Sequence, residues 1–309
     1  MTPNIRRVLV TGAAGSIGAE VCRVLVDAGV KVIGLDIAET PLFWLGKELQ
    51  GAGDFIPAIG SVSDRHLMQH IMRHHPQVVV HAAALKHVEM CERNVCEAVK
   101  VNIGGTMVVA SEADRAGARM VLVSTDKAVH PTSVMGATKA VAERLLWGAR
   151  DSRIVRLVNI WDSAGSLAHV VRDQIAKGGP VTLTDADMER MFMSIGAAAR
   201  LIGDAVFSGE EAKGSVLMVP TEYERRKISD VINQLIAESG RKDITVEEIG
   251  RFHGEKLSEE LTEILEHKYH DERMPWAWRL AVKLLVNMTN ERRVSPVRTG
   301  LFNLLEARK

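Results

Sequence analysis

Three polar residues that can transfer protons, Thr125, Asp126 and Lys127, stand directly after the apolar run 120–123. A carboxyl group and an amine side by side suit general acid–base catalysis. Lys139 follows twelve positions later, and Met135 stands four positions before it. A phenol at that spacing could take and return a proton, whereas a thioether cannot. The segment predicts proton chemistry by the group at 125–127; the alternative is a set of solvated or helix-capping side chains.

A glycine-rich turn precedes this segment. Gly12, Gly15 and Gly18 are spaced G-x-x-G-x-x-G after an apolar run and before an amphipathic stretch, which is the context of a dinucleotide-binding loop. The first glycine allows the tight turn, the second the approach of a pyrophosphate, and the third close packing of helix on strand. Asp36, 18 residues after Gly18, suits a ribose hydroxyl and disfavours a 2′-phosphate. The pattern predicts NAD rather than NADP; the alternative is a glycine turn without a ligand.

Strands and helices alternate through the first half of the chain. This alternation predicts an α/β fold with a Rossmann-type, doubly wound parallel sheet. From about Gly165 the alternation loosens, which indicates a smaller mixed α/β substrate-binding region. We expect an NAD-binding domain at 1–160 and a substrate-binding region at 161–309, partly interleaved with it. The expected strands are 8–10, 30–35, 55–59, 78–81, 120–124, 154–158, 181–184 and 215–219, and the expected helices are 17–28, 41–50, 64–74, 95–116, 137–149, 167–176, 197–207, 228–238 and 276–288.

Composition narrows the classes of function. The 309 residues carry a formal charge of zero, so there is no electrostatic signature of nucleic-acid binding. Three cysteines, Cys22, Cys91 and Cys96, argue for a reducing compartment and against a disulfide framework, and Cys91 and Cys96 are too isolated for a zinc site. No apolar stretch reaches the ~18–20 residues of a membrane span, so a cytoplasmic protein is expected. Apolar residues around much of the segments 102–116 and 137–150 fit two-sided burial.

Several motifs together resemble a known family. TGAAGSIG, Asp36, the HAAA run at 81–84, NIGGT at 102–106 and Lys139 resemble the extended short-chain dehydrogenase/reductases. HAAALKHVEMCE, STDKAVHPTSVMGATK, GGPVTLTDADMERMFM and GEKLSEEL are similar to the polysaccharide-biosynthesis (CapD-like) 4,6-dehydratases that act on UDP-N-acetylglucosamine. A methionine at position 135 is typical of the configuration-retaining branch. The resemblance extends to about residue 263 and implies cofactor contacts from Gly12, Gly15, Ser16, Ile17, Gly18, Asp36, Ala82, Ala83, Ala84, Asn102, Ser124 and Lys139. It further implies pairing through the segments 102–116 and 137–150, as a homodimer or larger homo-oligomer.

The resemblance also implies a reaction. NAD would take hydride from C4 of the sugar and return it to C6 after water has left, in surface polysaccharide or glycoconjugate biosynthesis. Asp126 would be the acid for the C6 hydroxyl and Lys127 the base at C5, while Lys139 would hold the nicotinamide ribose. Met135 would be a packing surface, so the O4 proton would leave through Thr125, Asp126 or water, among which the residues do not decide.

Residues on the substrate side are implied in the same way, and some depart from the family pattern. The expected contacts are Lys86, His87, Asn159, Arg190, Glu255 and Lys256, with Arg190 as the phosphate ligand. The departures are Ser61 for an aspartate, Ala164 for an arginine, Met191 for a tyrosine, and Phe252 and His253 for Arg-Pro. The nucleotide end is therefore altered, and two alternatives stay open. One is a sugar-nucleotide epimerase or ketoreductase, and the other a non-catalytic NAD-binding protein.

Overall fold

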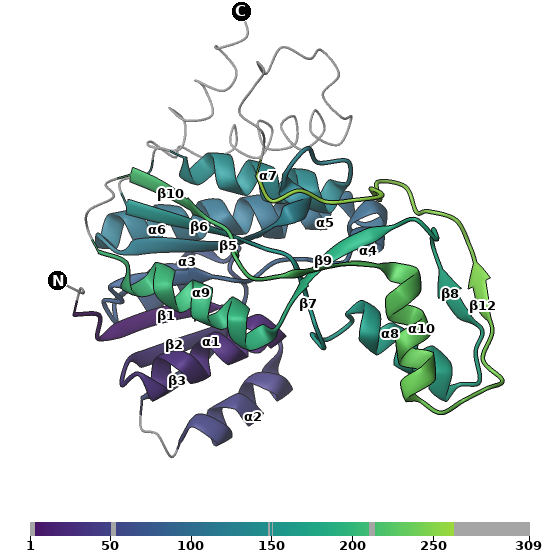
Figure 1. The fold of residues 1–309 in the computed structure, drawn as a ribbon. Helices are drawn as coiled ribbons and strands as arrows, with labels where there is room; N and C mark the ends of the chain where they lie inside the picture. The colour runs from purple at the N-terminus through teal and green to yellow at the C-terminus, as the bar shows by residue number, and fades with distance from the viewer. Residues whose placement is uncertain (1–3, 51–53, 148, 150, 210–213, 263–309) are drawn as a thin grey trace, which may run out of the picture.

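A computed structural model describes residues 4–50, 54–147, 149, 151–209 and 214–262. Its main layer is a parallel sheet in the order β10-β6-β5-β4-β1-β2-β3 (Figure 1). The chain builds β1, β2 and β3 outward, then crosses to β4 on the other side of β1, so a topological switch point lies between β1 and β4. The strands are β1 (Arg7–Thr11), β2 (Lys31–Asp36), β3 (Phe55–Ile59), β4 (Val78–His81), β5 (Arg119–Thr125), β6 (Asp151–Leu157) and β10 (Gly214–Met218).

Helices cover both faces of this sheet, because successive residues of its strands point to opposite faces and are apolar on both. Val8 and Val10 pack into one core and Leu9 into the other, and all three are fully buried. This arrangement confirms the predicted doubly wound α/β fold. The first core lies under α1 (Ser16–Asp27), α2 (Glu39–Leu49) and α9 (Ile195–Phe207), and the second under α3 (Arg65–Met72), α6 (Thr106–Ala116) and α7 (Val134–Leu146).

One predicted helix has a different internal structure. The segment 95–116 was expected to be a single α-helix, but it contains α5 (Val95–Ala98), a π-helix at Val99–Gly105 and α6. The wider π turn contains Asn102, whose side chain bonds to the backbone of Leu85 and to Thr138. Such turns recur at functional sites, and here the turn holds the segment after β4 against α7.

The remaining elements form a smaller mixed layer beside the sheet (Figure 1). The hydrophobic core of this layer joins α8 to α10. Two elements from the second half belong to the main layer instead, because β10 pairs with β6 and α9 packs on α1. The expected helix at 276–288 lies outside the described residues. The elements of the smaller layer are β7 (Asn159–Ile160), α8 (Leu167–Ala176), β8 (Val181–Leu183), β9 (Glu189–Met193), β11 (Glu224–Lys227), α10 (Ile228–Glu238) and β12 (Val246–Glu248).

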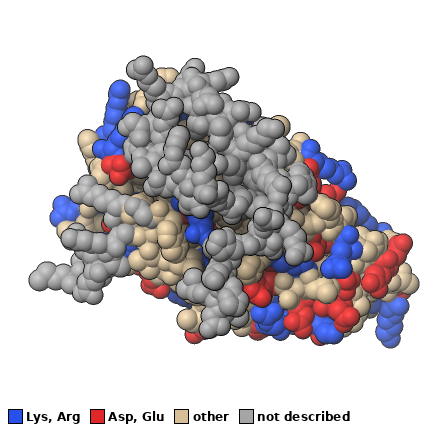
Figure 2. Space-filling model, turned by 90° about the horizontal axis from the view of Figure 1, so that it is seen from above, with Lys and Arg blue, Asp and Glu red and all other residues tan. Residues whose placement is uncertain are grey.

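Charged side chains are mixed on the surface. Figure 2 shows positive and negative groups interspersed over the part of this face that described residues form, without a one-signed stripe. None of the helices in the described ranges is long and apolar enough to cross a membrane.

Candidate active site

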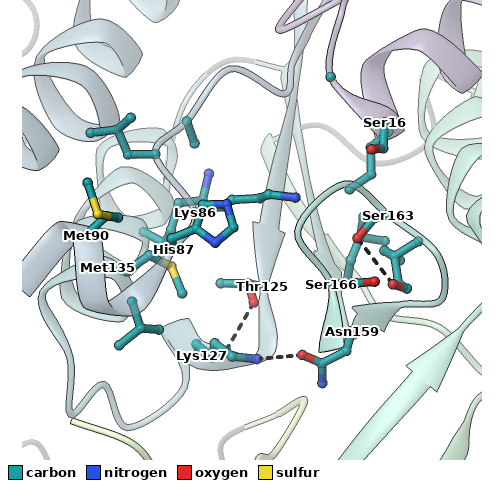
Figure 3. Close-up of a pocket in the computed structure, with 18 of the residues that line it drawn as sticks. Ser16, Lys86, His87, Met90, Thr125, Lys127, Met135, Asn159, Ser163 and Ser166 are labelled. Carbon is teal, nitrogen blue, oxygen red and sulfur yellow. Dashed lines mark hydrogen bonds between the residues drawn. The ribbon is translucent and has the colours of Figure 1, made fainter. Parts of the chain in front are cut away.

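A cavity of about 1130 Å³ opens where the parallel strands of the main sheet end. Its walls come from the loops after β1, β4 and β5 and from the smaller layer, and Figure 3 shows side chains from both layers around it. Ligands of open α/β sheets bind at this edge, beside the switch point. Among the sequence-predicted site residues, all but Asn102 and Asp126 line this cavity.

The glycine loop is packed too tightly for side chains at two positions. Gly12 has φ +70°, and a Cβ there would stand 2.7 Å from the backbone nitrogen of Ala83. A Cβ on Gly18 would stand 2.0 Å from the carbonyl oxygen of Gly12. The loop therefore lies directly on the segment after β4, and the N-terminus of α1 faces the cavity with its free backbone N–H groups. This cradle fits the diphosphate of a dinucleotide.

Asp36 marks the other end of this cradle. Its Oδ2 accepts from the backbone nitrogen of Ala14 and its Oδ1 from that of Ala38, each over 2.9 Å. The carboxylate is thus fixed at the end of β2, where it lines the cavity. An acidic group at this point fits the ribose hydroxyls of an adenosine.

The residues predicted to transfer protons lie where β5 ends in a 3₁₀ turn, Asp126–Ala128. Thr125 Oγ1 donates to Asp126 Oδ1 over 2.8 Å, and Lys127 Nζ donates to the same oxygen over 3.0 Å. Lys127 Nζ also donates to Asn159 Oδ1 over 3.3 Å (Figure 3). Thr125 and Lys127 line the cavity, whereas Asp126 is 0% exposed. Its Oδ2 is buried without a hydrogen-bond partner among the described residues, so this carboxylate contacts both Thr125 and Lys127 through Oδ1.

Helix α7 places Met135 and Lys139 on one wall of the cavity. The helix begins where Ser133 accepts from the backbone nitrogen of Gly136, so positions 135 and 139 lie one turn apart on the same face. Lys139 Nζ donates to the carbonyl oxygen of Val123 over 2.6 Å. Burial lowers the pKa of Lys139 to about 8, against the opposing charge of Glu143. Met135 is 4% exposed and presents an apolar surface.

A buried network under this wall was not anticipated from the sequence. Glu143 accepts from Ser124 Oγ over 2.6 Å and from both Nε and Nη2 of Arg156, over 2.9 and 2.7 Å. Ser124 thereby turns its hydroxyl toward α7. The sequence signal that could have indicated this network is the spacing of Lys139 and Glu143, which stand four residues apart on one helix.

His81 lies below the cavity and stays neutral. Burial, helped by the charge of Lys139, lowers the pKa of His81 to about 3. Its ring nitrogens pair with the hydroxyls of Thr11 and Thr106 over 2.7 and 3.0 Å. The imidazole therefore ties β1, β4 and α6 together.

The predicted substrate-side residues all border the cavity, and several are held by backbone groups. Arg190 is buried and donates from Nη1 to the carbonyl oxygens of Glu189 and Leu257, over 2.8 and 3.2 Å. Lys256 Nζ donates to the carbonyl oxygen of Val129 and to Glu259, each over 2.7 Å. The segment that carries Lys256 is thus held against the 3₁₀ turn that follows β5.

The departures from the family pattern lie in different places. Ser61 and Phe252 line the cavity, and Phe252 is 45% exposed. Met191 is buried in the core beneath β9. Ala164 stands on the loop between β7 and α8, where its backbone contacts both Ser16 and Lys86. Within the described ranges no three His, Cys, Asp or Glu side chains are grouped to hold a metal ion.

The fold and this cavity define the class of protein. A parallel sheet with a switch point, a glycine cradle after β1 and Lys139 on α7 are the features of an extended short-chain dehydrogenase/reductase. The family model described as "Polysaccharide biosynthesis protein" matches residues 8–277. The chain belongs to this family.

Named relatives agree with this assignment. An "Uncharacterized membrane protein MJ1061" of Methanocaldococcus jannaschii is 41% identical over 83% of this chain and 80% of its own. The "Probable polysaccharide biosynthesis protein EpsC" of Bacillus subtilis is 42% identical over 83% of this chain, which spans only 45% of that protein. A "UDP-N-acetylglucosamine 4,6-dehydratase (inverting)" of Campylobacter jejuni is 28% identical, over 83% of this chain and 77% of the dehydratase.

Solved structures share the fold. "Pen from Bacillus thuringiensis" superimposes with a TM-score of 0.76 at 31% identity, over 84% of this chain and 81% of that one. "DesIV (dTDP-glucose 4,6-dehydratase) from Streptomyces venezuelae with NAD and TYD bound" gives a TM-score of 0.73 at 22% identity, over 94% and 99%. The relatives and structural neighbours thus include proteins named as sugar-nucleotide 4,6-dehydratases.

Proposed function

We propose that this chain is an NAD-dependent sugar-nucleotide 4,6-dehydratase that converts UDP-N-acetylglucosamine to a UDP-2-acetamido-2,6-dideoxy-4-keto-hexose. The observation that carries the proposal is the hydrogen-bonded group Thr125, Asp126 and Lys127, in which Thr125 and Lys127 line the cavity. A dehydratase needs an acid and a base at C6 and C5 beyond the hydride acceptor. The Campylobacter relative, by its name, acts on the same sugar nucleotide.

The cofactor follows from the cradle of Gly12 and Gly18 together with Asp36. When bound, NAD supplies hydride acceptance from C4 and hydride return to C6. Asp36 presents a carboxylate where NADP carries its additional phosphate, so NAD is the cofactor that this end of the cavity favours. Titration of the protein with NADH and NADPH tests the preference, and tighter binding of NADPH would contradict it.

We assign proton transfer to two side chains that a hydrogen bond joins, first Thr125 and then Asp126. Asp126 has no exposed surface, so it acts through Thr125. The Thr125 hydroxyl takes the proton of O4 while it passes its own proton to Asp126 Oδ1. Met135 takes no part. This chain of groups replaces the direct contact between Asp126 and the C6 hydroxyl that the sequence implied.

The elimination then uses the stored proton. O4 and O6 of a hexopyranose can both approach one hydroxyl group, so Thr125 returns the proton from Asp126 to O6, which leaves as water. Lys127 takes the C5 proton as the base in this step and returns a proton to C5 when hydride returns to C6. Asp126 and Lys127 both end in their starting states, so the proton balance closes within one turnover.

A sugar-nucleotide panel tests the activity. Purified protein is incubated with UDP-, dTDP- and GDP-sugars, and the products are read by mass, by NMR and by absorbance of NADH. A dehydratase removes one water from UDP-N-acetylglucosamine without net NADH change. Conversion without mass loss would instead indicate an epimerase, and steady NADH consumption a ketoreductase. A protein that binds NAD and converts none of the panel would be a non-catalytic binding protein.

A further inference from the structure

The loop 161–166, between β7 and α8, joins two walls of the cavity through one residue. The backbone N–H of Ala164 donates to Ser16 Oγ over 2.9 Å, and its carbonyl oxygen accepts from Lys86 Nζ over 2.6 Å. Ser16 begins α1 at the glycine cradle, and Lys86 follows β4. Because β1 and β4 are neighbours in the sheet, the loop lies over the switch point.

A second contact presses the same loop onto the wall after β4. Gly165 has φ +69°, and a Cβ there would stand 2.6 Å from Cε1 of His87. In Figure 3, Ser163 and Ser166 mark the loop, and Ser16, Lys86 and His87 lie around the same hollow. The middle of the loop therefore has contact with both segments that would enclose a diphosphate.

The ends of the loop belong to the packed structure. The backbone nitrogen of Trp161 donates to Met193 over 3.0 Å, and the Trp161 ring stacks on Phe192 at 4.2 Å between centroids. At the other end the loop runs into α8 at Leu167. The ends of the loop are fixed, and its centre is held by Ser16 and Lys86. The centre can therefore open without disturbing the core.

We propose that the loop 161–166 is a latch that closes over the bound dinucleotide and sets its exchange rate. The bonds of Ala164 to Ser16 and Lys86 close the latch, and the dinucleotide enters and leaves when they open. The inference rests on the proposed cofactor but not on the dehydration chemistry. A cofactor that is regenerated in each turnover has no need to exchange, so slow exchange costs such an enzyme nothing.

The test compares rate constants with affinity. NADH binding and release are followed by stopped-flow energy transfer from tryptophan, which includes Trp161 in the cavity wall. Lys86→Met removes a charge-assisted bond from the latch, so association and dissociation should both accelerate about tenfold, with Kd nearly unchanged. A Lys86 that instead contacts the diphosphate directly predicts faster dissociation, weaker affinity and unchanged association. That result, or unchanged rates, would overturn the latch.

Two further measurements, a control variant and hydrogen exchange, complement this test. Lys177→Met removes a lysine of equal charge from an exposed ion pair with Asp173 at the end of α8, and NADH rates should stay at those of the unmodified protein. Hydrogen exchange of the peptide that contains 161–166 reports the latch without any activity. Ser16→Ala should accelerate exchange there, and protection equal to that of the unmodified protein would contradict the proposal. Sugar turnover is measured separately, so a failed latch and a failed dehydratase give different results.

Discussion

Thr125 Oγ1 donates to Asp126 Oδ1 over 2.8 Å, which connects a hydroxyl on the cavity wall to a carboxylate with no exposed surface. Lys127 Nζ donates to the same carboxylate oxygen. Since both donors share one acceptor, protonation of Asp126 changes the surroundings of both. In the mechanism that we propose, this relationship lets one buried group serve the oxidation of the sugar and the loss of water.

Substitutions of Thr125 and Asp126 should distinguish a proton relay through these side chains from a role in packing alone. Thr125→Val keeps the shape and removes the hydroxyl, so kcat should fall by roughly 10²–10⁴-fold. Thr125→Ser keeps a hydroxyl and should retain most of the activity. Asp126→Asn should lose as much as Thr125→Val, whereas Asp173→Asn, at an exposed ion pair on α8, is the matched control. Full activity in Thr125→Val would disprove the relay.

Met135 should be replaceable by another apolar side chain. It is buried and lines the cavity without a group that can transfer a proton. Met135→Leu conserves volume closely enough that stability should change by less than about 1.5 kcal/mol, and kcat should stay within about threefold. Steady-state kinetics check this expectation. A loss of two orders of magnitude in a folded variant would assign the residue a chemical role.

The glycine cradle should not tolerate a methyl group. Gly18→Ala brings a Cβ to 2.0 Å from the carbonyl oxygen of Gly12, so the loop must shift and NADH binding should fall by at least about tenfold. Gly203→Ala, inside α9, is the control, because the nearest atom to a Cβ there would be Cγ1 of Val24, at 3.9 Å. That variant should bind NADH normally and gain up to about 1 kcal/mol of stability. Equal binding by both variants would contradict the packing argument.

His81 should make the protein sensitive to acid. Its pKa is about 3 in the folded state and about 6.5 in an unfolded chain. Between these values the unfolded state binds the proton and the folded state does not, so stability is lost as pH falls from 6.5 toward 3. At pH 5 the loss is about 2 kcal/mol.

Urea unfolding at pH 7 and pH 5 measures this loss. His81→Gln should reduce the difference between the two pH values by about that amount, and His66→Gln, at an exposed position, should leave it unchanged. Equal pH dependence in the His81 variant and the unmodified protein would refute the assignment.

The sequence predicted the sheet well because its strands are continuous apolar runs that are buried on both faces. It did not predict the π turn at Val99–Gly105. An apolar period of 3.6 describes which face of a helix is buried, whereas the extra residue of a π turn depends on a tertiary bond, here that of Asn102 to the segment after β4.

The position of the site was predictable and the direction of its side chains was not. Residues that follow parallel strands reach one edge of the sheet, which placed Thr125 and Lys127 at the cavity. Asp126 points away from the cavity because it begins a 3₁₀ turn, where neighbouring side chains diverge. Ala164 carries no functional group, so the bonds that it makes through its backbone left no signal in the sequence.

The most direct test of the central claim is the reaction of UDP-N-acetylglucosamine in D₂O, with the product read by mass and NMR. If Lys127 takes the C5 proton and returns one after exchange with solvent, the product lacks one water and carries a single deuterium, at C5. Lys127→Met should give no dehydrated product, and Lys177→Met should behave as the unmodified protein. A product that retains its water, or dehydration by Lys127→Met at the normal rate, would contradict the account.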